Sequence, residues 1–493
     1  MSSTFFGLET AKRGLNTHQS ALQTTGHNIA NANTPGYTRQ RVNFKTTEPY
    51  PAPALNRPQI PGQFGTGVRA GSVERVRDAF LDVQYRGENS KYGYWNAQAE
   101  ALRRMEEIMN EPSEDGLAKT LDRFWQSLQD LAVNPNDSGA RSVVRQRGIA
   151  VADTFRYLSN SLTSIQEDVQ SEIEMTVEEI NSIARQLDNL NKQIAAVEPH
   201  GYLPNDLYDE RDRLLDQLSE LANLKIDYVK SGGNALDIAE GKVSVFIVAS
   251  DGIEHLLVNG ADLAAGPSPV VVDSDTNEVT IGGDPVELDM TIGKLSGLID
   301  MHKEYTDMLE NLDIMAYSFV TRFNEVHRDG WNLEAINSDP PAHNPVNFFE
   351  ELTEISGAAK NINLDEAIID SLDNIAAALT PEEGDGGNAL KLADVKNEVL
   401  QDLPGTSTLQ SFYQGIIGEM AVKAQEANRM QGNSDTLRSA VEQRRQSTSG
   451  VSLDEEMINM VRFQQAYNAS ARMVTVVDEM LDKIINGMGI VGR

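Results

Sequence analysis

The side chains that could do chemistry in this sequence are seven histidines and two groups of acidic residues. The histidines are spread along the chain, at His18, His27, His200, His255, His302, His327 and His343. Neither H-E-x-x-H nor C-x-x-C occurs, and the sequence contains no cysteine. Zinc and catalytic metal sites need several such ligands at short, fixed spacing. The pattern therefore predicts no metal site.

The two acidic groups have simpler structural interpretations. The run Glu382-Glu-Gly-Asp-Gly-Gly387 has the composition of a calcium loop, but it lacks the alternating ligands and the distal Glu of an EF-hand, which favours a solvated loop. Asp454, Glu455 and Glu456 stand at the start of an apolar run, where carboxylates cap a helix and favour its N-terminus. G-x-S-x-G, P-loop and kinase motifs are absent from the sequence. We predict no catalytic residue, no cofactor and no enzyme activity.

Length, composition and charge argue against several other classes of function. The chain has 493 residues, 40% of them hydrophobic, and a formal net charge of -32. Residues 1–45 hold five Lys/Arg against one Glu, whereas 329–402 hold sixteen acidic residues against three lysines. Nucleic-acid binding needs clustered Lys and Arg, so we do not expect it. No run of 18 or more apolar residues exists and no cleavable signal peptide is visible, so we expect no membrane insertion.

The first element that could position side chains is an amphipathic helix from about residue 8 to residue 32. Leu8, Leu15, Leu22 and Ile29 recur every seven residues, the spacing of a coiled-coil seam, and His18 should pack in an interface on that seam. The helix should end at a Pro-Gly turn, in a segment that contains Asn28, Asn31, Asn33 and Tyr37. These asparagines could be C-cap residues, make contacts between subunits, or do both.

A second seam occupies the end of the sequence. Its apolar residues fall on heptad positions, interrupted by Ser470: Met460, Phe463, Tyr467, Val474, Val477, Leu481, Ile484 and Met488. Two seams of similar length at opposite ends of a chain predict that the ends pair with each other. We expect an assembly interface at the residues of both seams, from Leu8 to Ile29 and from Met460 to Ile484, together with Asn28, Asn31, Asn33 and Tyr37.

Free energies favour assembly over a simple pair of helices. Burying the four residues of the first seam would contribute roughly 6–12 kcal/mol, whereas ordering about thirty residues costs roughly 1–2 kcal/mol for each residue. The second seam brings a comparable deficit. Neighbouring copies of the same pair would supply the missing burial, so we predict that folding of the ends is coupled to assembly.

Between the seams the pattern predicts a mainly α, multi-domain fold with β insertions. Helical spacing covers about 78–110, 113–131, 138–197, 205–224, 294–326 and 408–446. Val- and Leu-rich runs separated by Gly, Asp, Asn and Pro turns predict one small outer β domain. The expected order is a terminal coiled-coil-like helix pair, then a long helical bundle, with the β material farthest from the chain ends.

These elements suggest a division of the chain into four regions. Residues 328–404 would be an acidic mixed segment that packs on the bundle and the β domain. The other regions are a terminal helical domain (1–45 and 450–493), a long-helix bundle (46–225, 293–327 and 405–449) and a small β domain (226–292).

Both ends and the middle of the sequence resemble a known family. Residues 21–37, which read ALQTTGHNIANANTPGY, resemble the N-terminal signature of the bacterial flagellar axial proteins, which include rod, hook and hook-associated proteins. Residues 37–42, 205–219, 449–456 and 463–467 are similar to segments of the members of this family that form the junction between hook and filament. The resemblance covers most of the chain.

The resemblance implies a structural protein of the extracellular flagellum, exported by the flagellar type III apparatus without a cleaved signal peptide. It implies that the terminal helices polymerise with further copies of the chain. The implied partners are the hook protein, hook-associated protein 3 and an export chaperone at the C-terminal region. A hook or rod protein is the alternative within the family. An exported coiled-coil scaffold or adhesin is the alternative outside it, and a cell-wall hydrolase is disfavoured because 226–292 is too small for a carboxylate-bearing cleft.

Overall fold

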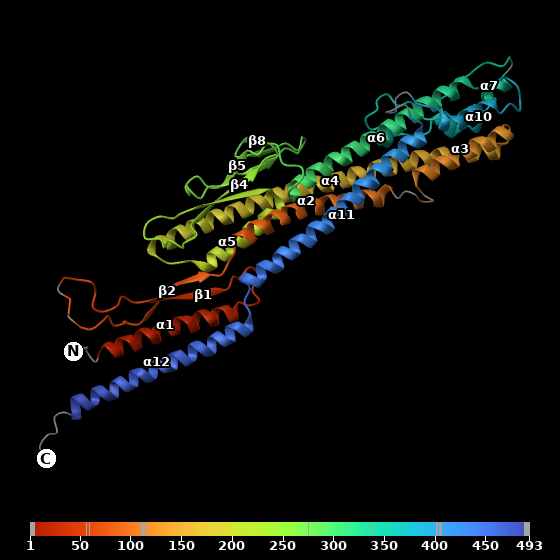
Figure 1. Ribbon diagram of the computed structural model, residues 1–493. Helices are drawn as coiled ribbons and strands as arrows, with labels where there is room; N and C mark the ends of the chain where they lie inside the picture. Colours follow the sequence, from red (N-terminus) through yellow and green to blue (C-terminus); the bar gives the residue numbers. More distant parts are fainter. Residues whose placement is uncertain are drawn as a thin grey trace.

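The protein is an elongated, mainly helical molecule whose first and last helices lie side by side at one end (Figure 1). The computed structural model describes residues 5–487 except 56, 59, 110–112, 114, 115, 275, 339, 401, 402 and 404–406. Met488, the last residue of the expected second seam, lies outside the described residues. The expected fold class is confirmed, because long helices dominate and the sheets are small and antiparallel.

Long helices form a bundle that extends away from the terminal helices (Figure 1). They are α2 (Ala79–Met109), α3 (Leu117–Val133), α4 (Ser138–Val197), α5 (Asn205–Leu221), α6 (Lys294–Asp329) and α11 (Leu409–Ser449), with a 3-10 turn at Glu198–His200. α2 packs against α5, α6 and α11, and α4 packs against α3, α5 and α6. The helix predicted over 138–197 has those bounds because Asp137 caps it, accepting hydrogen bonds from the backbone N–H groups of Gly139 and Ala140. α3 begins four residues later than the predicted 113, after an N-cap at Gly116.

A two-stranded antiparallel ribbon connects the first helix with the bundle. Strand β1 (Gln40–Thr46) pairs with β2 (Val68–Arg75), and both pack on α1 (Phe5–Ala30). The proline-rich segment 47–67 closes the ribbon as a long loop, and Tyr50 and Phe64 pair across it through backbone hydrogen bonds of 2.9 and 2.8 Å. The ribbon and its loop therefore lie along the first helix rather than along the bundle (Figure 1).

The β material consists of two small three-stranded sheets beside α4. One sheet contains β3 (Leu224–Val229), β4 (Lys242–Val248) and β5 (Glu254–Val258), and the other contains β6 (Val270–Val272), β7 (Val279–Ile281) and β8 (Asp284–Val286). Two asparagines of α4 hold them. Asn191 donates to the carbonyl of Val243 and accepts from its N–H, at 2.8 and 2.9 Å, and Asn181 does the same with Val270 at 2.8 Å. The polar Asn191, which is buried among the apolar residues of α4, is thus a sheet-binding residue.

The acidic segment, and not the β material, lies farthest from the chain ends (Figure 1). It contains α7 (Leu333–Asn337), α8 (Ala358–Asn361), α9 (Glu366–Asp370), α10 (Gly387–Asp394) and 3-10 turns at Leu372–Asn374 and Val395–Asn397. These short helices pack on α3, α4 and α6. Because α4 and α6 continue beyond the sheets, their apolar ends need a cover. The segment supplies Phe348 and Phe349, which bury fully against Phe124, Phe319 and Phe323.

One histidine is buried beside the phenylalanines that the acidic segment covers. His327 lies 1% exposed at the end of α6; its Nδ1 is 2.7 Å from the carbonyl oxygen of Val346, and its Nε2 accepts from the N–H of Ala376 at 3.0 Å. Burial disfavours the imidazolium and lowers the pKa of His327 to about 4. The neutral ring therefore links two parts of the acidic segment to the bundle.

Candidate functional site

The first and last helices form an antiparallel terminal pair, α1 with α12 (Leu453–Gly487), and small residues line their closest contacts. A Cβ atom placed on Gly14 would lie 3.0 Å from the hydroxyl oxygen of Ser470, and one on Gly7 would lie 3.6 Å from Val477. Ala11 and Ala21 are buried on the same side of α1. Small side chains let the two backbones approach closely, so Ser470, which interrupts the predicted heptad seam, stands at a tight crossing.

The large residues expected at the assembly interface lie mostly on the edges of this contact. Leu8, Leu15, Leu22 and Ile29 are each half-buried. On α12 the half-buried residues are Met460, Phe463, Tyr467, Val474 and Leu481, while Val477 is buried and Ile484 is exposed. The terminal pair therefore brings both predicted seams together but leaves much of their apolar surface uncovered by the rest of the chain.

His18 lies in an aromatic cluster that joins three elements of the terminal region. Its ring centroid is 5.9 Å from that of Phe44 on β1 and 6.4 Å from that of Phe463 on α12, and the two phenylalanine rings are 5.8 Å apart. Burial lowers the pKa of His18, because the charged ring would lose its hydration. Within this chain, His18 therefore packs in the interface between α1, the ribbon and α12.

Asn28 has a structural role that goes beyond capping a helix. Its side chain is buried, and its amide nitrogen donates to the carbonyl of Gln40 at 2.8 Å and to Glu456 at 3.1 Å. Its amide oxygen accepts from the N–H of Gln40 at 3.0 Å and from the hydroxyl of Tyr37 at 2.7 Å. The side chain thus fastens the end of α1 to the first strand and to the first turn of α12.

The other two asparagines of the turn behave differently. Asn31 donates to the carbonyl of His27 at 3.1 Å and accepts from Thr34 at 3.1 Å, as a C-cap residue does. Asn33 is exposed and lines a polar cavity at the base of the terminal pair. Of the three, Asn33 is the one whose side chain the structure leaves open to another subunit.

The acidic residues at the start of α12 hold an arginine from the N-terminal region. The guanidinium group of Arg39 forms ion pairs with Glu455 at 2.6 Å and with the buried Glu456 at 2.8 Å. The backbone N–H of Arg39 donates to the carbonyl of Ser449 at 2.9 Å. Arg39 therefore holds the end of α11 and the start of α12, on both sides of the short connection 450–452.

A buried cluster of charged residues, which we call the ionic joint, fixes the ribbon on the bundle. Arg75, at the end of β2, lies 2.8 Å from Asp209 and 2.8 Å from Asp212, both on α5, and also pairs with Glu240. Asp212 is also 3.0 Å from Arg77 and 3.5 Å from Arg86 of α2. These residues, together with Arg211, make up the joint, and each of its charges has a partner of opposite sign.

Electrostatics keep Asp212 ionised in this buried position. Burial alone would raise the pKa of the carboxyl group, but Arg211, Arg77, Arg75 and Arg86 outweigh it and hold the pKa below its usual value. A carboxylate shared by several guanidinium groups is costly to expose or to neutralise. The ionic joint therefore acts as a rigid connection between the terminal region and the bundle.

The joint was not foreseen from the sequence, although its charges are visible there. Residues 209–213 read Asp-Glu-Arg-Asp-Arg, a dense alternation of signs that is typical of a solvated helix face. The signal that could have revealed the joint is that these charges share a short helix with its buried leucines. A charged side chain buried there needs a partner of opposite sign. Those partners, Arg75 and Arg77, are more than 130 residues away in the sequence.

The other candidate chemical sites have structural explanations. In the acidic glycine-rich loop, the carboxylate of Asp385 accepts from the backbone N–H groups of Leu379, Thr380 and Gly387, each at 2.8 Å, so both oxygens of Asp385 are already engaged by the backbone of the loop and its neighbours. Within the described part of the chain, no group of three or more His, Cys, Asp or Glu side chains could hold a metal ion. No helix among the described residues combines the length and apolar character needed to cross a membrane.

Comparison with known proteins identifies the class to which this architecture belongs. The families that match the two ends of the chain place it in the class of flagellar axial proteins. Residues 8–38 match the family described as flagella basal body rod protein, and 442–487 match the C-terminal family of the basal body rod FlgEFG proteins. Residues 102–339 match the family described as the helical domain of flagellar hook-associated protein FlgK.

Full-length relatives make the assignment specific. Flagellar hook-associated protein 1 of Bacillus subtilis (strain 168) is 45% identical, with 100% of both chains covered. The protein of the same name from Escherichia coli (strain K12) is 24% identical, with 97% of this chain and 99% of the relative covered. The solved flagellar hook junction protein FlgK of Burkholderia pseudomallei shares the fold, with a TM-score of 0.58, 16% identity, and coverage of 74% of this chain and 100% of that one. The chain belongs to the family of flagellar hook-associated protein 1, a structural component of the bacterial flagellum.

Proposed function

We propose that this protein forms the junction between the hook and the filament and that it polymerises through its terminal pair. The observation that carries the proposal is the incomplete burial of that pair. Among the described residues of α12, Val477 is the one apolar side chain that is buried in the single chain, although the helix spans 35 residues. The names of the relatives support the place in the flagellum.

The free energy of folding argues that the pair needs neighbours. Ordering α12 costs roughly 1–2 kcal/mol for each residue in backbone entropy, and a buried apolar side chain returns roughly 1.5–3 kcal/mol. The half-buried residues of the two seams return only part of this on the monomer. Contacts with adjacent copies would bury the remainder, which is why the assembly interface is expected at Leu8, Leu15, Leu22, Met460 and the other seam residues.

The proposed partners follow from this location. The hook protein would contact the assembled ring on one side, and hook-associated protein 3 would contact it on the other. An export chaperone would cover the C-terminal region, where α12 carries exposed apolar residues, before export through the flagellar type III apparatus. No catalytic role is proposed, and the distal acidic segment would face outward from the assembled tube.

Deletion of the chain tests the proposal directly. Cells that lack it should build hooks without filaments and should secrete filament monomers, and a plasmid-borne copy should restore the filaments. Cells without hooks would instead support the alternative within the family, a hook or rod protein. Cells with normal filaments would support the exported scaffold or adhesin.

A further inference from the structure

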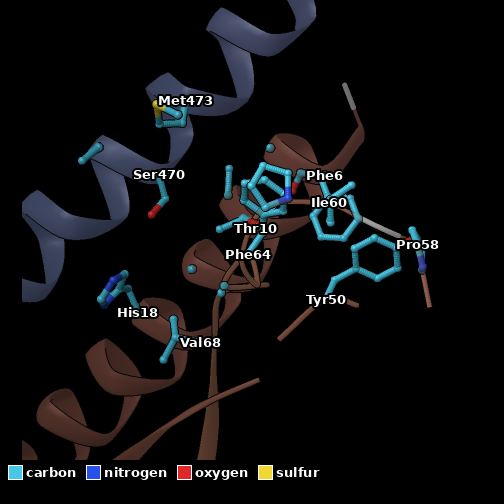
Figure 2. A pocket seen from close by; sticks show the side chains of 17 residues that line it. Phe6, Thr10, His18, Tyr50, Pro58, Ile60, Phe64, Val68, Ser470 and Met473 are labelled. Carbon is cyan, nitrogen blue, oxygen red and sulfur yellow. The ribbon is translucent and has the colours of Figure 1, made fainter. Parts of the chain in front are cut away.

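An apolar groove lies beside the terminal pair, where the loop of the ribbon leans over the first helix (Figure 2). Its volume is about 880 Å³. Phe6 and Thr10 of α1 form its floor, Ile60 and Phe64 of the loop form one side, and Met473 of α12 forms the other. The side chains around it are mainly apolar, so water is a poor occupant.

The groove is a built feature of the chain, because the base of the loop is bound to α1. The guanidinium group of Arg13 donates to the carbonyl of Thr66 at 3.2 Å, and the hydroxyl of Thr17 donates to the carbonyl of Val68 at 3.2 Å. Gly67 approaches so closely that a Cβ atom there would lie 3.4 Å from Thr10. These contacts hold the loop at a fixed height above the helix.

The groove continues along α12 as a stripe of exposed apolar residues. Met473, Val476, Met480 and Ile484 follow each other at steps of three and four, which places them on one side of the helix. They are between 42% and 52% exposed. Met473 belongs to both the groove and the stripe. Together they form one apolar surface, which we call the receiving surface.

A second apolar surface lies elsewhere on the same pair. Leu8, Leu15 and Leu22 of α1 are half-buried, and none of them lines the groove. We call these three residues the leucine edge. The fourteen steps from Leu8 to Leu22 correspond to about 21 Å of helix, and the eleven steps from Met473 to Ile484 correspond to about 17 Å, at about 1.5 Å for each step. The edge is therefore long enough to cover the stripe and reach into the groove.

We propose that the receiving surface of one copy binds the leucine edge of α1 from a second copy. The inference rests on the proposed function, because it names the contact through which the terminal pairs would assemble. The two surfaces are different parts of one chain, so the contact is heterologous and repeats from copy to copy, producing a ring or helix instead of a closed twofold dimer.

Charge is compatible with this pairing. Next to the leucine edge, α1 carries Lys12 and Arg13 against Glu9, whereas the last three turns of α12 carry Asp478, Glu479 and Asp482 against Lys483. A contact between α1 of one copy and the end of α12 of another therefore joins segments of opposite net charge.

Disulfide trapping tests the contact, since the chain contains no cysteine of its own. Cells would make two variants at once, Leu15→Cys and Met473→Cys, as their only copies of the protein. Oxidation of isolated flagella should then produce a covalent dimer that contains one chain of each variant. Cells that make either variant alone should give monomer. The matched control replaces Met473→Cys by Thr475→Cys, an exposed neighbour on another side of α12, and should also give monomer.

Each other outcome overturns the proposal. Equal dimers from Leu15→Cys alone would show a twofold contact, and equal dimers with Thr475→Cys would show no preference for the receiving surface. Filament-bearing cells without any trapped dimer would refute this contact while leaving the junction function intact.

A second variant keeps the test valid if cysteine pairs block assembly. Ile60→Asp places a charge in the groove, so it should abolish incorporation into flagella while the thermal midpoint of the monomer stays unchanged. Normal incorporation would refute the groove as a binding surface. Failure of the junction function itself would appear differently, as normal filaments in cells that lack the chain.

Discussion

Replacing Asp212 with asparagine removes the carboxylate that Arg75, Arg77, Arg86 and Arg211 share in the ionic joint. Asparagine has nearly the same shape, so the change leaves the packing intact and alters only the charge. Three of the four guanidinium groups lie less than 10% exposed at their side chains, and the fourth, Arg77, is 14% exposed. Water can therefore replace little of the lost attraction.

The expected loss follows from the burial of the joint. Removing one member of a buried charge cluster destabilises a protein by about 3–5 kcal/mol, because the remaining charges stay desolvated and unbalanced. Asp209 and Glu240 still neutralise part of the positive charge on Arg75. We therefore expect Asp212→Asn to lie near the lower end, at about 3 kcal/mol.

Urea unfolding of the full chain at pH 7, followed by circular dichroism, measures this loss. Glu107→Gln is the matched control, because Glu107 pairs with Arg103 on α2 at 2.5 Å but both side chains are more than half exposed. Exposed pairs contribute little, so this variant should unfold like the wild type. If Asp212→Asn also unfolds like the wild type, the joint does not stabilise the attachment of the ribbon and the reasoning is wrong.

Three further outcomes are expected. Gly93→Ala should destabilise the bundle by about 1–3 kcal/mol in the same urea assay, because its Cβ atom would lie 2.1 Å from the carbonyl oxygen of Glu220, whereas Gly87→Ala, with open space around it, should be neutral or slightly stabilising. His327 has a folded-state pKa of about 4, below its unfolded value of 6.5, so its contribution is complete above pH 6.5 and up to about 3 kcal/mol should be lost as the pH falls to 4. Unfolding measured across that range should lose this part of the pH dependence in His327→Gln, and an unchanged profile would contradict the assignment. Leu22→Asp should abolish incorporation into flagella while calorimetry of the monomer shows an unchanged melting temperature; normal incorporation would show that the edge is not an interface.

The long helices could be predicted from the sequence because their apolar residues repeat over many turns. The apolar residues of α4 from Leu162 to Ile194 are buried almost throughout, and Asp137 marks the start of the helix. The pairing of the chain ends was also predictable, since two unmatched seams of similar length each needed a partner. These features depend on local periodicity, which a sequence displays directly.

The contacts that decide the terminal region depend instead on residues far apart in the chain. Heptad spacing selected the leucines of α1, but the closest helix contacts use Gly7 and Gly14, which carry no apolar signal. The sequence allows Asn28 to be interpreted as a cap, but it does not show the bond to Glu456, because that partner lies 428 residues away. The acidic segment gave no periodicity at all, and its place at the far end follows from the apolar ends of α4 and α6 that it covers.

The positions of α1 and α12 in the sequence also decide when a growing chain can form the terminal pair. α1 comes first among the described helices and α12 comes last. In a chain that emerges N-terminus first, α1 therefore lacks its partner α12 until every element between them has emerged. Only then can the paired surface form, so a partial chain has no complete surface to offer its neighbours. The emergence of α12 is thus the step that allows the terminal pair to form.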